Sequence, residues 1–92
     1  MQSRYVTIRN DSNYDVWIDS LYNKGWLYPT DKMRILVTRQ EGQVHISVYR
    51  RTAEEETELV MIRTMRRGST LALNSKSLEF VDLYRNYTPS DS

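Results

Sequence analysis

Apolar side chains recur at every second position along much of the chain, and this period limits what the chain can fold into. Val44, Ile46 and Val48 alternate with polar or aromatic residues, and shorter stretches near Val6, Val16, Ile35, Leu71 and Leu78 repeat the pattern. Successive side chains of a β-strand point to opposite faces, so each stretch would present one apolar face. The residues are rich in β-branched and aromatic types, which suit a pleated surface. The period therefore predicts strands.

Clusters of turn-forming residues separate these stretches. Two of them, 40–42 and 66–69, contain a glycine, and we expect each to close a hairpin between its flanking strands. The expected strands are 4–9, 15–20, 33–39, 43–51, 58–65, 70–74 and 78–84. This spacing of short strands predicts an all-β fold, an antiparallel β-sandwich of seven to eight short strands.

Residues 53–67 are compatible with two structures. Thr52 and Glu55 have the spacing of a helix capping box, glutamates precede arginines, and Gly68 follows where a helix would end. Leu59 to Ile62, however, shows no helical stripe, and β-branched residues are frequent in this segment. These residue types favour a strand over a helix.

The chain has 92 residues, which supports one hydrophobic core. We expect a single sandwich domain over 1–85 and a polar C-terminal tail over 86–92. No apolar run reaches the ~18 residues of a membrane span. The first residues lack the apolar segment of a signal peptide, which favours a cytoplasmic location.

The sequence offers little for catalysis or metal binding. It has no cysteine and one histidine, His45, with Ser47 on the same strand face but no orienting carboxylate. Asp15, Asp19 and Asp31 lack the spacing of a calcium loop. We therefore expect a protein that is not an enzyme, with no catalytic residue, metal or cofactor.

Two groups of residues are candidates for binding. Aromatic residues crowd positions 14–29, either as an exposed anchor patch or as cover for a sandwich end. His45, Tyr49 and Arg51 share one strand face, either as a recognition stripe or as a solvated surface, and Arg34 would be their neighbour if 33–39 pairs with 43–51. The candidate partner-binding residues are Trp17, Tyr22, Trp26, Tyr28, Arg34, His45, Tyr49 and Arg51.

Charge allows an alternative. The net charge is +1, but residues 32–52 carry +4 (five cations and Glu41), and residues 53–62 carry −4. The arginines at 50, 51, 63, 66 and 67 could form a basic platform for nucleic acid with Tyr49 and His45. The glutamates nearby would oppose phosphate, and no RNP-type motif is present, so a protein partner is favoured over nucleic acid.

The order of the motifs resembles that of PEGA-type modules and related small transthyretin-like β-sandwiches. The matching segments are Val6 to Ile8, the turn from Asn10 to Ser12, Val16 to Asp19, Pro29-Thr30, and Gly42 to Val48, followed by a glycine turn at Gly68 and a closing leucine strand. This resemblance implies a small sandwich that serves as a non-enzymatic adhesion or interaction module.

Together these features predict a non-catalytic interaction or assembly module. It would bind a protein partner through an aromatic and arginine surface, or through an exposed sheet edge. A chain this short would suit a subunit of a larger viral or cellular assembly, and a homo-oligomer is compatible with the sequence. The alternative is a small nucleic-acid-binding β-barrel with an Arg/Tyr/His face.

Overall fold

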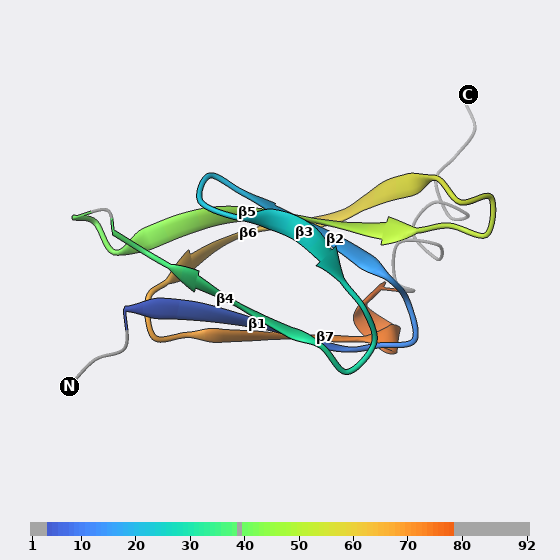
Figure 1. Ribbon diagram of the computed structural model, residues 1–92, viewed down its shortest axis with the longest axis horizontal. Coiled ribbons are helices and arrows are strands. Elements are labelled where there is room, and N and C mark those ends of the chain that lie inside the picture. Colours follow the sequence, from blue (N-terminus) through green and yellow to red (C-terminus); the bar gives the residue numbers. More distant parts are fainter. Residues whose placement is uncertain (1–3, 39, 79–92) are drawn as a thin grey trace, which may run out of the picture.

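The computed structural model describes residues 4–38 and 40–78, which form two sheets packed face to face (Figure 1). The seven strands are β1 (Tyr5–Asp11), β2 (Val16–Ser20), β3 (Lys24–Leu27), β4 (Lys32–Leu36), β5 (Gln43–Arg51), β6 (Thr57–Arg66) and β7 (Thr70–Asn74). One sheet has the order β4-β1-β7, and the other has the order β3-β2-β5-β6. The predicted all-β sandwich is therefore confirmed.

One strand pair departs from the expected antiparallel arrangement. β1 and β7 are parallel, with Ile8 opposite Leu71, whereas all other strand pairs of the described residues are antiparallel. β7 reaches β1 after the chain has crossed from the four-stranded sheet. Because no tight turn joins β1 to β7, the two strands can pair in either direction, whereas strands joined by a hairpin must be antiparallel.

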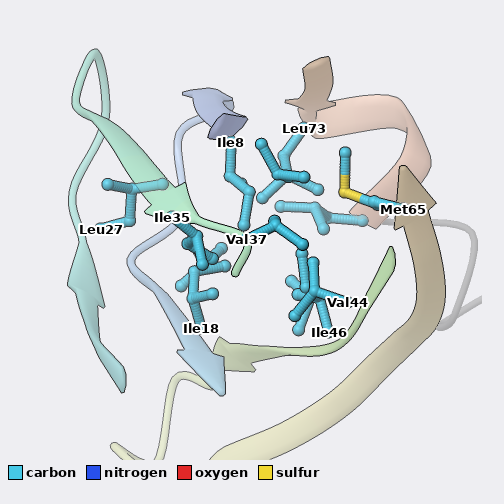
Figure 2. Close-up of a cluster of buried hydrophobic side chains, with 13 residues drawn as sticks. Ile8, Ile18, Leu27, Ile35, Val37, Val44, Ile46, Met65 and Leu73 are labelled. Carbon is cyan, nitrogen blue, oxygen red and sulfur yellow. The ribbon is translucent and has the colours of Figure 1, made fainter. Parts of the chain in front are cut away.

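The core lies between the sheets and is built by the two-residue period (Figure 2). Val44, Ile46 and Val48 of β5 point inward, as do Val6 and Ile8 of β1, and all are almost completely buried. The other fully buried apolar residues include Val16, Ile18, Ile35, Leu73 and Leu78. Burial of an aliphatic side chain contributes about 1.5–3 kcal/mol, so this shared core holds the two sheets together.

The two expected hairpins at 40–42 and 66–69 are wrong. β4 and β5 belong to different sheets, as do β6 and β7, so both segments are crossovers. The crossovers run side by side, and the Arg67 amide donates to the Gly42 carbonyl at 2.9 Å. Gly42 has a φ of 70° there, which favours glycine. Alternation specifies which face of a strand is buried but not which strand lies beside it.

The sequence did not predict β3. This strand has four residues, and only Leu27 is fully buried, so it carries no alternating signal. It forms because the chain turns back tightly after β2: the Ser20 hydroxyl donates to the Asn23 carbonyl at 2.8 Å and accepts from the Asn23 amide at 2.9 Å. Trp26 is thereby placed beside Trp17.

Residues 57–66 form a strand, so the strand interpretation of 53–67 is confirmed. The capping-like spacing serves the β5–β6 turn instead, where the Thr52 hydroxyl accepts from the Glu56 amide at 3.2 Å. Figure 1 shows this hairpin extending beyond the rest of the sandwich.

The expected strand 78–84 is wrong at its first residue. Residues 75–78 form a helical turn, in which Asn74 Oδ1 accepts from the Ser77 amide at 2.8 Å, and Leu78 is buried. An asparagine that bonds the backbone three residues ahead favours a helical start over a continued strand. Residues 79–84 and the expected tail at 86–92 lie outside the described residues.

Candidate functional site

A row of large side chains crosses the outer face of the four-stranded sheet. The registers place Trp26 of β3 opposite Trp17 of β2, Trp17 opposite Tyr49 of β5, and Tyr49 opposite Leu59 of β6. Trp17 and Tyr49 alternate with core residues on their strands, so they face away from the core, and the registers place Trp26 and Leu59 on the same side. Both tryptophans and Tyr49 are partly exposed. The row therefore combines large aromatic surface with access to solvent.

Trp26 is the centre of the contacts in this row. Its ring meets the Trp17 ring edge-on, with centroids 5.4 Å apart and an interplanar angle of 71°. Tyr28, just beyond β3, is nearly parallel to Trp26 at 6.5 Å and is 46% exposed. Edge-to-face and offset-stacked pairs each add about 0.5–1.5 kcal/mol beyond burial, so the rings hold one another in place.

Arg51 adds a fixed positive charge at the end of this row. Its guanidinium carbon lies 4.2 Å from the Trp26 ring centroid, and its Nε lies 3.5 Å from Asp15 Oδ2. The cation–π contact and the carboxylate restrict where the side chain can point. We call Trp17, Trp26, Tyr28, Tyr49 and Arg51 the aromatic face.

Tyr22 and His45 lie at a shallow hollow beside the aromatic face. The hollow lies at the end of the sheet where β2 turns into β3, and its lining includes Asp19, Lys24 and the exposed Leu21. His45 is on the outer side of β5, and its Nδ1 lies 2.8 Å from Thr64 Oγ1 of β6. The aromatic face and this hollow together contain seven of the eight candidate residues.

Arg34 is the eighth candidate residue, and it lies elsewhere. It belongs to β4 of the other sheet, where its guanidinium carbon is 4.0 Å from the Tyr5 ring centroid. The expected pairing of 33–39 with 43–51 is wrong, so Arg34 is not a neighbour of His45. The physical reason is the crossover at 40–42, which moves β5 to the other sheet.

Arg50 is buried, and the sequence analysis did not anticipate its position. Only 5% of this residue is exposed, because it shares the inward face of β5 with Val48. Its Nη1 donates to the Leu78 carbonyl at 3.2 Å, and its Nη2 lies 3.4 Å from Glu58 Oε1. The alternation that identified Val44, Ile46 and Val48 as core also places Arg50 inside.

The remaining arginines do not assemble a basic platform. Arg63 lies opposite Ile46, on the inner side of β6, whereas Arg66 lies opposite Gln43. The Arg67 side chain lies against Gly42, at the crossovers. With Arg50 buried, the five arginines proposed for a nucleic-acid platform point in different directions.

The aspartates have local partners. Asp15 pairs with Arg51, Asp19 pairs with Lys24 at 3.8 Å, and Asp31 Oδ2 accepts from the Tyr28 amide at 3.2 Å. Within residues 4–38 and 40–78, no group of three or more histidine, aspartate or glutamate residues is placed to hold a metal ion. No helix in that part of the chain is both long and apolar enough to cross a membrane.

Comparisons with protein-family models, curated proteins and solved structures give no match for this chain. The resemblance to PEGA-type modules therefore stays a prediction, and the function has to be argued from the geometry of the aromatic face.

Proposed function

We propose that this protein is a non-catalytic interaction module that docks a protein partner on the aromatic face. The observation that carries the proposal is the row from Trp26 through Trp17 and Tyr49 on the solvent side of a sheet whose other side already supplies the core. Tryptophan, tyrosine and arginine are the residue types that dominate the energy of protein interfaces.

Preorganisation supports a protein partner. The rings of Trp17, Trp26 and Tyr28 contact one another, and Arg51 is held by Asp15. Binding would therefore immobilise few additional side chains, which lowers the entropic cost of association. The partner would cover the rings, while Arg51 would fix the partner's orientation by donating a hydrogen bond to a neutral carbonyl oxygen at the rim.

The same contacts weaken the nucleic-acid alternative. A base stacks on a ring face, and one face of Trp26 is already covered by the Arg51 guanidinium. Arg51 is paired with Asp15, so it adds little net charge to attract phosphate.

Edge-strand pairing is the second route by which a protein partner could bind, because a strand at the edge of a sheet leaves backbone groups available.

The test compares two exposed residues on opposite outer faces. Tyr28 belongs to the aromatic face and is 46% exposed, whereas Leu36 lies on the outer side of the three-stranded sheet and is 43% exposed. We expect Tyr28→Ser to weaken capture of the partner that copurifies from the native source at least tenfold, as expected for loss of about 1.4 kcal/mol at an interface anchor. Leu36→Ser should leave capture unchanged. Equal loss in both variants would contradict the proposal.

A second measurement separates the alternative function. Binding of a labelled oligonucleotide is followed while salt is varied, since phosphate contacts weaken steeply as salt rises. We expect no saturable binding at low salt. Tight binding that falls with salt and is lost in Arg51→Ala would favour the nucleic-acid function instead.

A further inference from the structure

Among the strands of residues 4–38 and 40–78, β6 is the longest, and it lies at one edge of its sheet. It has ten residues, and among the described residues it pairs with β5 alone. On its outer side, Leu59 and Ile62 are 46% and 62% exposed. The backbone groups along a sheet edge can pair with a further strand. A long edge with exposed apolar side chains therefore offers a template for another chain.

Charge changes sign along this edge. Glu54, Glu55 and Glu56 are exposed in the loop before β6, whereas Arg63 and Arg66 are exposed towards its far end. A parallel second copy would bring like charges together. An antiparallel second copy would place each acidic end against a basic end, and two-fold symmetry would repeat the contact. The edge is therefore complementary to itself in the antiparallel direction only.

We propose that β6 is a self-association edge at which two copies of this chain pair antiparallel and join their four-stranded sheets into one. The side of the sheet to which each residue points selects the register. A β-bulge at Val60 shifts the alternation, so that Leu59 and Ile62 both lie on the outer side while Glu58 and Arg63 lie on the inner side. Pairing Leu59 with Ile62 of the second copy matches outer with outer residues.

The same register places Glu58 opposite Arg63 of the second copy on the inner side, so that this arginine would join the pair that Glu58 already forms with Arg50. The bulges of the two copies then meet at the two-fold axis. A bulge and an inward-facing charge usually protect an edge from indiscriminate pairing. Here both features leave one register in which charges and apolar side chains match. The result is a closed dimer with one continuous sheet rather than an open chain of subunits.

Disulfide trapping tests the register. The chain has no cysteine, so an introduced cysteine is the only thiol that can form a cross-link. Directly paired strand residues have Cα atoms about 4.5–5.5 Å apart, within the span of a disulfide. We expect a mixture of the Leu59→Cys and Ile62→Cys chains to form a cross-linked dimer on mild oxidation. Each variant alone should not cross-link, because its two cysteines would lie about 10 Å apart along the strands.

Charge reversal tests the complementarity. In this register Glu54 and Glu55 lie opposite Arg67 and Arg66 of the second copy. Glu54→Arg/Glu55→Arg and Arg66→Glu/Arg67→Glu should therefore each sediment as one chain, and a mixture of the two should sediment at twice the mass. Lys32→Glu/Arg34→Glu, on the other sheet, is the matched control and should stay dimeric. Circular dichroism checks that each variant is folded. The cysteine pair tests the proposal independently should a charge variant fail to fold.

Three results would overturn the proposal. The first is a wild-type mass of one chain at all concentrations from about 1 µM to about 1 mM. The second is cross-linking of Leu59→Cys alone as efficient as that of the mixture. The third is a dimer that survives both charge reversals, which would mean that a different surface joins the copies. The proposal does not depend on the aromatic face, because Tyr28→Ser should remain dimeric even where it loses its partner.

Discussion

The two outer faces of this sandwich have different chemistry. On the three-stranded sheet, the outward residues of β1, β4 and β7 are mostly charged or small and polar, as at Arg9, Lys32, Arg34 and Thr70. On the four-stranded sheet, the central outward row is Trp26, Trp17, Tyr49 and Leu59. An ordinary solvated sheet needs only the first kind of face. The aromatic row is therefore a feature that the core does not require, and this difference directs the functional argument to the four-stranded sheet.

The largest expected effect concerns two arginines, one from each sheet, that both lie over a tyrosine ring. Arg50 is buried over Tyr14 at 5.1 Å and pairs with Glu58, whereas Arg34 is exposed over Tyr5 at 4.0 Å. We expect Arg50→Ala to lower the free energy of unfolding by about 3–5 kcal/mol, because it leaves a buried carboxylate without its partner.

Arg34→Ala is the control and should lower this free energy by no more than about 1 kcal/mol, the worth of an exposed cation–π contact. Urea unfolding measures both variants. Similar losses for Arg50→Ala and Arg34→Ala would mean that burial does not distinguish the two sites.

An intermediate effect separates the aromatic face from the other outer face. Trp26→Ala removes the contacts with Trp17, Tyr28 and Arg51, and we expect a loss of about 2 kcal/mol in the free energy of unfolding. Leu36→Ala, on the outer side of β4, should change it by less than about 0.5 kcal/mol. Thermal unfolding measures the change in both variants. A change near zero for Trp26→Ala would show that the ring contacts of Trp26 do not stabilise the fold.

The smallest effect concerns surface ion pairs. Asp15→Asn breaks the pair with Arg51, in which both side chains are about one-third exposed. Asp11→Asn breaks the pair with Arg9, in which both side chains are more exposed. We expect losses below about 1 kcal/mol and about 0.5 kcal/mol, respectively, with the former persisting further into high salt. Unfolding at low and high salt measures both. A larger loss of unfolding free energy for Asp11→Asn than for Asp15→Asn would contradict the expectation that the less exposed ion pair contributes more.

The sequence predicted which face of a strand carries the apolar residues better than it predicted which strands lie side by side. The period of β5 put Val44, Ile46 and Val48 on one face, and all three are core. The period of β2 put Trp17 opposite Val16 and Ile18 but left open which side is exposed, and the structure buries Val16 and Ile18. It could not show that 33–39 and 43–51 separate into different sheets, because crossovers and hairpins share the same turn residues. All five residues of the aromatic face were predicted, but as two unconnected groups, one of Trp17, Trp26 and Tyr28 and one of Tyr49 and Arg51.

What joins those groups is long-range pairing. The β2–β5 register places Tyr49 opposite Trp17, and the short strand β3 returns Trp26 to the same row. Neither contact is encoded by local spacing. Arg50, by contrast, was predictable, because its position continues the inward period of β5 past Val48. Arg50 was assigned to the possible nucleic-acid platform because of its positive charge alone.

The most direct test of the central claim uses the two tryptophans of the chain, both of which lie on the aromatic face. The protein is labelled with fluorotryptophan, and its two fluorine NMR signals are followed while the copurifying partner is added. The account predicts that both signals shift or broaden as the complex forms. Formation of the complex, verified by sedimentation, with both signals unchanged would contradict it.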